Sequence, residues 1–427
     1  MLSHKTVRPA FFPAPFLVSI VLIGTVMAGT IDNRSNFSAA YLRQLARSSD
    51  TRLPDAAAYN PAGLAFIDPG LHLEIDNQTL LKFNSNSFDQ NGERVFRFKS
   101  DLVSPVLPTG FAVWRRQKWA AFASGTLVGG GGNLHYEKGT VTVLPVVAAL
   151  ATANPPTAPD LQLSSLYWAA TAGGAYSLYP WLSLSLAGRW VIASTQIKGE
   201  ARGESLIDHE ETANFPTLLF GLHAKPMPGL DIGLRYENIA KLEWTVQKSD
   251  FHLERAMNSA AASAYASTLR GTLREKGTTF QHDLPPVASL GIGYTFNPYF
   301  RVDVSETFYW QTLADWEGEE DEVDNGWESA LGVEVSPLPN RLSLSAGIML
   351  TQAGAGPQTY FTESPALDGL NFAGGGRYKF THGVALDLGL TYAGTFADHA
   401  EVPGLGDVDL RKHTWIYAVS LGWHLPE

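Results

Sequence analysis

The sequence predicts an all-β fold, a fourteen-stranded antiparallel transmembrane β-barrel with an N-terminal hatch, a segment that plugs the barrel interior. Three observations predict it. Apolar and polar residues alternate with a period of two, and short turns alternate with long loops along the chain. Charged residues make up 17% of the chain against roughly a quarter in soluble domains, and aromatic residues make up 11%.

The composition also excludes several classes of protein. The net charge of -11 comes without a basic block, so nucleic acid is not an expected partner. The chain has no cysteine, which removes disulfides, thiolate metal sites and cysteine nucleophiles. Beyond the N-terminus no apolar run approaches the roughly 20 residues of a transmembrane helix, so a helical membrane protein is excluded.

Residues 1–28 have the pattern of an export signal. His4, Lys5 and Arg8 form a basic leader, residues 16–26 are apolar, and cleavage is expected after Ala28. The alternative is a membrane anchor, but the apolar stretch is too short to cross a hydrocarbon core of about 30 Å as a helix. We therefore expect an exported chain.

Strict alternation identifies the strands. In residues 181–190, Leu182, Leu184, Leu186 and Trp190 share one face, and serine, alanine and arginine share the other. The same pattern recurs in residues 231–236, 341–348 and 383–392. Each of these segments reads as a strand with one apolar side.

The connections predict how many strands there are. Six short turns lie near residues 115–118, 179–181, 225–229, 297–298, 337–340 and 381–383. Seven longer polar segments lie near residues 83–106, 139–160, 200–213, 248–282, 317–325, 353–368 and 397–411. Their alternation requires fourteen strands over residues 69–427, with both chain ends on the short-turn side. A soluble β-sandwich or propeller is the alternative; aromatic residues at strand ends, as at Trp168 and Trp181, favour the membrane barrel.

Residues 29–68 do not have the strand pattern. Residues 38–47 contain helix formers, with Tyr41, Leu42 and Leu45 on a common face, and residues 59–65 are an apolar, turn-rich segment. A free tail would be more charged and less apolar. We expect these residues to form the hatch.

The whole mature chain resembles the FadL family of outer-membrane transporters for long-chain fatty acids and aromatic hydrocarbons. The resemblance rests on the order and spacing of several stretches, namely residues 55–65 with Asn60-Pro61-Ala62, residues 119–136 with four consecutive glycines, and residues 284–294, 308–310 and 331–333. It implies passive uptake of hydrophobic compounds across the outer membrane of a Gram-negative cell. It also implies a monomer that contacts outer-membrane lipid, lipopolysaccharide and the barrel assembly machinery, with no cofactor.

The resemblance assigns two structural roles. Asn60, Pro61 and Ala62 fall in the hatch and become gate elements, where proline fixes φ and lacks a donor. Gly129, Gly130, Gly131 and Gly132 lie inside the third predicted strand, where a bulge or break would open the wall laterally. A strand end that is merely flexible is the alternative reading of these glycines.

Ligand contacts are predicted at two arginines. Arg189 and Arg235 fall on polar faces of predicted strands and are candidates for the carboxylate of a fatty acid, because guanidinium holds carboxylate in a bidentate fork. Most lumen charges are expected to pair with one another instead. If the ligand is a neutral hydrocarbon, this role disappears.

The loop near residues 248–282 contains an alanine-rich helical stretch. Leu253, Met257, Ala260, Ala261 and Ala264 are predicted on one face. That face is either an entry surface for an apolar ligand or a surface that packs on neighbouring loops.

Other functions have weaker support. Histidines are scattered singly and no Gly-x-Ser-x-Gly elbow occurs, so we expect no enzyme. A metal site is not expected, because His209-Glu210-Glu211 has no second histidine at a useful spacing. A general porin for small hydrophilic solutes is the main alternative, and the predicted hatch argues against it.

Overall fold

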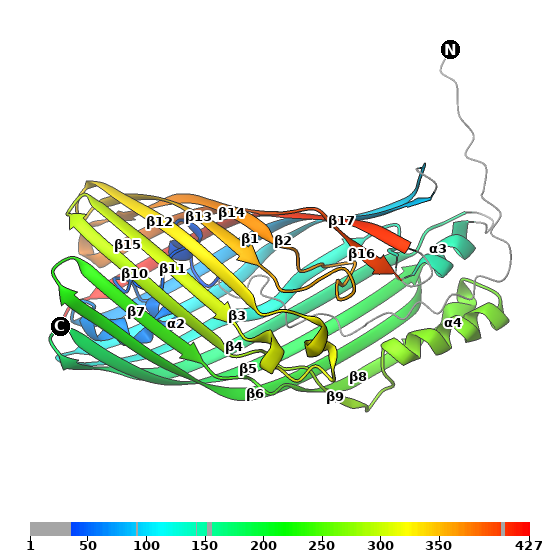
Figure 1. The fold of residues 1–427 in the computed structure, drawn as a ribbon, viewed down its shortest axis with the longest axis horizontal. Coiled ribbons are helices and arrows are strands. Elements are labelled where there is room, and N and C mark those ends of the chain that lie inside the picture. The colour runs from blue at the N-terminus through cyan, green and yellow to red at the C-terminus, as the bar shows by residue number, and fades with distance from the viewer. Residues whose placement is uncertain (1–35, 91–92, 142, 152–155, 403–405) are drawn as a thin grey trace, which may run out of the picture.

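The computed structural model describes residues 36–90, 93–141, 143–151, 156–402 and 406–427. The predicted export signal, residues 1–28, and the first residues of the predicted hatch lie outside these ranges. Within them, fourteen antiparallel strands close into a barrel, because β1 is paired with β2 on one side and with β17 on the other (Figure 1). The predicted fold class is confirmed.

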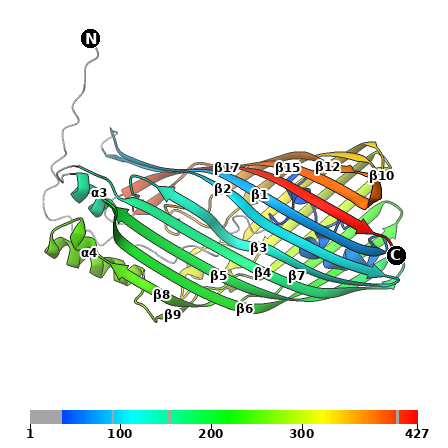
Figure 2. The same cartoon turned by 180° about the vertical axis from the view of Figure 1, so that it is seen from behind.

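The barrel strands are β1 Gly70–Gln90, β2 Glu93–Arg116, β3 Trp119–Tyr136, β4 Asp160–Tyr179, β5 Leu182–Ala201, β6 Glu204–Met227, β7 Leu230–Glu237, β10 Val287–Asn297, β11 Phe300–Tyr309, β12 Gly326–Leu338, β13 Leu342–Gln352, β14 Gly369–Lys379, β15 Val384–Thr395 and β17 Gly406–Leu425. Short strands β8 Glu243–Phe251, β9 Thr279–Gln281 and β16 Asp398–Val402 extend the sheet beyond the barrel. The strands β1 to β6 and β17 are much longer than the others and form a tall wall, which Figure 2 shows from behind.

All six predicted short turns occur at one end of the barrel, and the barrel strands begin and end there, at Gly70 and Leu425. We call this the short-turn end and the opposite end the long-loop end. Three of the predicted long loops are wrong. The segments 83–106 and 200–213 are instead parts of strands, since β1 pairs with β2 up to Gln90 and Glu93, and β5 pairs with β6 up to Ala201 and Glu204. Most of the segment 397–411 is also strand, since β16 pairs with β17 up to Val402 and Gly406.

The first two errors have the same cause. Near the long-loop end the outward face of the tall wall is polar as well as the inward face, so the alternation of apolar and polar residues disappears. On β5 the outward residues Trp190 and Ile192 are apolar, and the next outward residues are Ser194, Gln196 and Lys198. The inward face of β5 carries Ser183, Ser185 and Arg189, all buried, as the alternation predicts.

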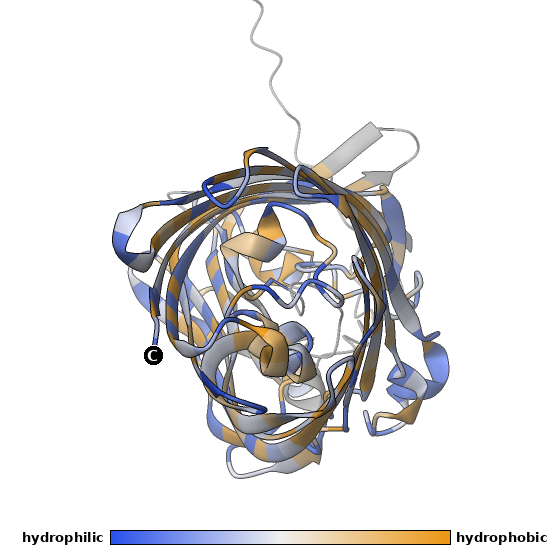
Figure 3. Ribbon diagram, turned by 90° about the vertical axis from the view of Figure 1, so that its left-hand side faces the viewer, coloured by the Kyte–Doolittle hydropathy of each residue, from blue (hydrophilic) through white to orange (hydrophobic). Residues whose placement is uncertain are grey.

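The hatch lies inside the barrel near the short-turn end. Its helices are α1 Ala39–Leu42, α2 Ala56–Tyr59 and the 3-10 helix η1 Pro61–Phe66, and nearly every residue from 37 to 65 is buried. The view along the barrel in Figure 3 shows these helices within the ring of strands. The predicted helix over residues 38–47 is shorter than expected, because Leu45 has a φ of 65° and cannot continue a right-handed helix.

The remaining helices belong to the connections. They are α3 Leu144–Ala151, α4 Ser259–Thr272 and the 3-10 helices η2 Leu253–Arg255, η3 Gln311–Leu313, η4 Glu319–Glu322 and η5 Thr381–Gly383. In the described part of the chain, no helix is long and apolar enough to cross a membrane.

Candidate functional site

Asn60, Pro61 and Ala62 fix the hatch against the wall. The side-chain amide of Asn60 donates to the carbonyl of Ser48 at 3.1 Å and to the carbonyl of Leu222 in β6 at 3.3 Å. Pro61 begins η1, where the missing N–H costs nothing. The carbonyl of Ala62 accepts a hydrogen bond of 2.6 Å from the hydroxyl of Ser183 in β5. The role of these three residues as gate elements stays a prediction.

A glycine in the wall makes this close approach feasible. A Cβ atom added at Gly233 in β7 would lie 2.0 Å from the carbonyl oxygen of Ser48 and 2.3 Å from the amide nitrogen of Asn60. Only glycine lets the hatch backbone sit so close to the strand.

Ion pairs join the hatch internally and to the wall. Within the hatch, Arg47 is fully buried and pairs with Asp50 and, at 2.6 Å, with Asp55. Arg52 pairs with Asp50 at 2.7 Å and with Glu334 of β12 at 2.9 Å. The hatch is therefore held by charged contacts as well as by packing.

Two further hatch residues reach the wall. Arg43 pairs with Glu334 at 2.8 Å and with Asp387 of β15 at 3.4 Å. Ser49 donates to Asp303 of β11 at 2.8 Å. Contacts with three different strands restrict the hatch to one position.

The charge state of the network follows from Asp50. Burial alone would raise the pKa of this carboxyl, but the guanidinium groups of Arg47 and Arg52 hold the pKa well below its usual range. Asp50 is therefore ionised at neutral pH.

Both arginines predicted to bind a ligand face the barrel interior and already have protein contacts. Arg189 forms a two-oxygen ion pair with Glu237 of β7 at 2.6 Å and donates to the hydroxyl of Thr171 at 2.9 Å. Arg235 donates to the carbonyl of Ala58 in the hatch. These contacts agree with the expectation that most lumen charges pair with protein groups. Ligand binding by Arg189 and Arg235 stays a prediction.

The glycines at 129–132 lie in β3 and interrupt its pairing. Gly129 faces Tyr167 of β4 and Gly132 faces Ser165, so β3 has one residue more than β4 between these pairs. Gly130 and Gly132 have φ values of 85° and 68°, the left-handed region that favours glycine. Together they form a β-bulge that bends the strand.

On its other side β3 is unpaired over much of its length. The ladder between β2 and β3 runs from Arg116 and Trp119 to Gly110 and Gly125, and no further pairs join these two described strands. The next contact is a hydrogen bond of 2.9 Å from the backbone N–H of His135 to the hydroxyl of Ser100. We call the unpaired edges, residues 101–109 of β2 and 126–134 of β3, the β2–β3 break.

A cavity of about 400 Å³, with a lining that is part apolar and part polar, lies at the β2–β3 break. Leu102 and Val103 line it from β2, and Asn133, Leu134 and His135 line it from β3. Outward polar residues complete it, namely Gln162, Ser164, Gln196 and Lys198. Leu134 also lines a second cavity, inside the barrel.

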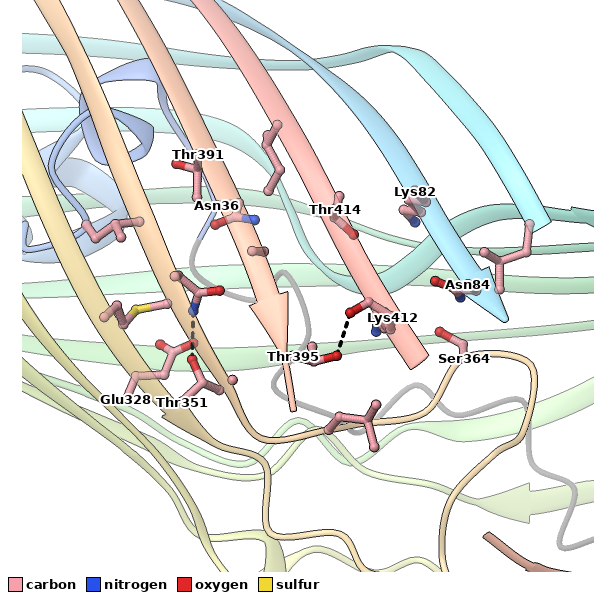
Figure 4. A pocket seen from close by; sticks show the side chains of 18 residues that line it. Asn36, Lys82, Asn84, Glu328, Thr351, Ser364, Thr391, Thr395, Lys412 and Thr414 are labelled. Atoms are coloured by element: carbon pink, nitrogen blue, oxygen red, sulfur yellow. Dashed lines mark hydrogen bonds between the residues drawn. The ribbon is translucent and has the colours of Figure 1, made fainter. Parts of the chain in front are cut away.

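This lumen cavity has a volume of about 70 Å³ and lies between the hatch and the long loops. Hydroxyl and amide side chains dominate its lining, as Figure 4 shows, with Asn36, Asn84, Thr351, Ser364, Asn371, Thr391, Thr395 and Thr414. Lys82 and Lys412 also point into it.

Neither lysine was predicted from the sequence. Lys82 follows Leu80 and precedes Asn84 on the inward face of β1, but the polar segment starting at residue 83 was interpreted as a loop. Lys412 lies beside another predicted loop. Extending the period of two from residue 72 to 86 would have placed Lys82 inside the barrel.

The long-loop end carries an apolar cluster. This cluster joins α3, α4 and the long-loop ends of the tall-wall strands. It includes Val146, Leu150, Tyr265, Leu269 and Phe361. The buried face of α4 is Ala262, Tyr265 and Leu269; of the predicted stripe, Leu253 is buried but Ala260 and Ala261 are exposed. The predicted stripe is wrong in register, because the helix begins only at Ser259 after its N-cap Asn258. The observed burial favours packing on neighbouring loops over an open entry face.

One buried histidine makes the long-loop end sensitive to pH. His282 is 3% exposed, stacks on Trp316 at 5.1 Å, and neither ring nitrogen has a hydrogen-bond partner among the described residues. Burial, and then the charge of Arg274, lower the pKa of His282 from 6.5 to about 4, although Glu317 and Glu320 act in the opposite direction.

We expect the packing around His282 to weaken as the pH falls from 6.5 towards 4. The unfolded segment binds a proton in this window before the folded one does, so stability is complete above 6.5 and falls by at most about 3 kcal/mol by pH 4. Limited proteolysis of the long loops across this window measures the effect. The variant His282→Phe keeps the stacking without the titration and should lose the pH dependence; an unchanged profile would assign the effect to another group.

Comparison with known proteins finds similar solved structures, and these establish the fold. No protein-family model matches the sequence, and no curated protein matches it. A Pseudomonas aeruginosa FadL homologue matches with a TM-score of 0.66 at 14% identity, over 91% of this chain and 98% of that chain. The chain has the FadL fold.

Two further solved structures agree. The Pseudomonas putida toluene transporter TodX matches with a TM-score of 0.61 at 13% identity, over 91% of this chain and 98% of that one. The Ralstonia pickettii toluene transporter TbuX matches with a TM-score of 0.53 at 13% identity, over 87% of this chain and 94% of that one. At this identity the likeness establishes the FadL fold, and the function has to be argued from the residues of this chain.

Proposed function

We propose that the protein is an outer-membrane channel of a Gram-negative cell for the passive uptake of hydrophobic compounds, and not an enzyme. The observation that carries the proposal is the combination of a closed barrel whose outward face is apolar with a lumen that the hatch occupies. A closed barrel with an apolar outer belt is suited to a membrane, since it leaves no backbone edge in hydrocarbon. The toluene transporters of the same fold support the choice of cargo.

Release takes place laterally at the β2–β3 break. Three features support this route: the bulge at Gly129–Gly132, the unpaired edges, and the cavity of about 400 Å³ that lies between them. Leu134 lines both this cavity and the lumen cavity, which places the two on either side of the wall at this point.

A general porin is the alternative. The buried hatch, fixed by Arg43, Arg47 and Arg52, disfavours it, because a water-filled path through the lumen would have to pass these residues. Ion conductance of the unmodified protein therefore discriminates the two functions.

The test compares cells that carry the protein with cells that lack it. Uptake of radiolabelled toluene and of radiolabelled dodecane is measured, together with ion conductance of the purified protein in planar bilayers. We expect faster uptake of at least one hydrocarbon and little conductance. Large conductance without stimulated uptake, from a correctly assembled barrel, would establish a porin instead.

A further inference from the structure

The lipid-facing belt of the tall wall has a hollow next to the β2–β3 break. Strands β1 to β6 line a cavity of about 740 Å³ there, and Figure 2 labels these strands. Its lining consists of runs of three residues, such as Ala123, Ser124 and Gly125 on β3, in which the outer two are exposed and the middle one faces the lumen. The cavity is therefore open to the membrane and not to the barrel interior. We call it the outer hollow.

Two rows of small residues form the floor of the outer hollow. Across β2, β3 and β4, residues directly opposite one another are Gly110, Gly125 and Ala170 in one row, and Ala112, Ala123 and Ala172 in the next. Ile75 of β1 and Trp190 of β5 close the ends of the first row. Elsewhere the outward face of the belt carries large side chains such as Leu234, Leu331 and Leu388. The hollow is thus a local feature of the wall.

The outer hollow ends at the β2–β3 break. Gly110 and Gly125, which lie in its floor, are also the last pair of the ladder between β2 and β3. Beyond them the two strands separate, and the cavity of about 400 Å³ lies farther along the same wall. An occupant of the hollow would therefore lie against the end of the break, on its outer side.

A hydrocarbon chain is the occupant that fits the outer hollow. The outward side chains around it are apolar, and an empty hollow would forfeit dispersion contacts with its lining. A second barrel is convex, so its wall would rest on the rim at Ile75 and Trp190 and not reach the floor. One flexible acyl chain can follow a floor that is about three strand spacings, or roughly 14 Å, across.

The depth of the outer hollow indicates which leaflet supplies the chain. On β5 it lies at Gly188 and Trp190, and the outward face becomes polar at Ser194. The aromatic residues at the short-turn end of the same strand are farther away, at Tyr179 and Trp181. The hollow thus lies in the half of the belt nearer the long loops, which face the cell exterior in outer-membrane barrels.

The headgroup level above the outer hollow is polar and suits a sugar. The side chains that line the cavity of about 400 Å³ there include Asn133, Gln162, Ser164 and Gln196. Amide and hydroxyl groups of this kind both donate and accept hydrogen bonds, as sugar hydroxyls do. Ser164 precedes Ala170 of the floor on β4, at a distance along the strand of about 20 Å. This order, polar groups outside and apolar groups deeper, matches an outer-leaflet lipid.

We propose that the outer hollow binds one acyl chain of an outer-leaflet glycolipid, which in the outer membrane is lipopolysaccharide, with the sugar headgroup beside the β2–β3 break. The bound lipid covers the outer mouth of the break. This inference concerns the lipid side of the wall and is independent of the cargo that the channel carries.

Competition between two lipids tests the proposal. The assembled protein in a non-ionic detergent is mixed with equal amounts of purified rough-type lipopolysaccharide and phosphatidylethanolamine, and native mass spectrometry counts the lipids on each barrel. We expect one lipopolysaccharide molecule to be retained per barrel, in preference to phosphatidylethanolamine. Packing in the hollow and hydrogen bonds at the headgroup level both contribute to the preference.

Substitutions assign the bound lipid to the outer hollow. Ala123→Phe combined with Ala172→Phe fills the floor with two rings at directly opposite positions and should lower retention about tenfold, because the chain loses its contacts there. Val304→Phe is the matched control. It adds a ring to the outward face of β11, outside the hollow, and should leave retention unchanged. The heat-dependent gel shift of folded barrels checks assembly of both variants.

Three outcomes would overturn the proposal. Equal retention of phosphatidylethanolamine would contradict the choice of an outer-leaflet glycolipid. Lipopolysaccharide retained at the same level by the filled double variant would place the lipid elsewhere on the barrel. Paired barrels without bound lipid, disrupted by the same double variant, would show that a second copy of the chain covers the hollow.

Discussion

Deleting Gly130 is expected to close the lateral route. Gly129 pairs with Tyr167 and Gly132 with Ser165, so the bulge contains one residue too many. Without Gly130, Gly132 follows Gly129 by two positions, as Ser165 precedes Tyr167 by two, so the pairing becomes regular from Gly129 onward and only the extra residue Val128, between Leu127 and Gly129, remains. With this part of the bulge removed, we expect β3 to continue its pairing with β2 beyond Gly125.

Hydrocarbon uptake by this variant should fall about tenfold or more, because the route through the wall depends on the bulge. Radiolabelled toluene or dodecane measures it, and the heat-dependent gel shift of folded barrels checks assembly. Deletion of Gly318, in an exposed loop where an added Cβ would meet nothing, is the matched control and should leave uptake unchanged. Undiminished uptake by the assembled Gly130 deletion would show that cargo leaves at the short-turn end.

Replacing Arg47 by methionine is expected to release the hatch. The substitution leaves Asp55 buried without its ion-pair partner and leaves Asp50 paired with Arg52 alone, and removing one member of a buried ion pair costs about 3–5 kcal/mol. With the hatch displaced, the lumen becomes a water-filled pore. Planar-bilayer recordings should show stable ion conductance that the unmodified protein lacks.

Two further variants make the hatch experiment decisive. Arg116→Met removes an exposed arginine 3.7 Å from Glu427 at the short-turn end and should leave the conductance low. Gly233→Ala places a Cβ atom 2.0 Å from the carbonyl oxygen of Ser48 and should displace the hatch without changing any charge. Low conductance in both Arg47→Met and Gly233→Ala, with assembled barrels, would mean that the hatch does not block the pore.

Much of the barrel could be predicted because lipid-facing strands alternate apolar outward residues with polar inward residues. Residues 181–190 alternate strictly, and the structure places Leu184, Leu186 and Trp190 on the outward face and Arg189 inside. Five of the six short turns were equally predictable, since proline, glycine or asparagine marks them, and the sixth, residues 115–118, is a short polar and charged run. Turn count and alternation together give the number of strands.

The candidate site was less predictable, because it depends on contacts between distant residues. Arg189 meets Glu237, and Arg43 meets Glu334, pairs that no local pattern connects. Lys82 was missed because the polar segment that starts at residue 83 was interpreted as a loop, so the strand was ended too early. The glycine run indicated a bulge, but the loss of pairing between β2 and β3 is a property of two strands together.

The polarity of the outward face of the tall wall has a consequence for where the proposed lateral route meets the bilayer. Leu127 of β3 faces Trp168 of β4, which faces Ile192 of β5; beyond Ile192 the outward side chains of β5 are Ser194, Gln196 and Lys198. The β2–β3 break lies beside this transition, with Val103 and Val106 of β2 exposed on its outer side. Cargo that follows the proposed lateral route would therefore enter the bilayer near the edge of its apolar core, on the side of the long loops. Its crossing to the other leaflet would then be left to the lipid bilayer.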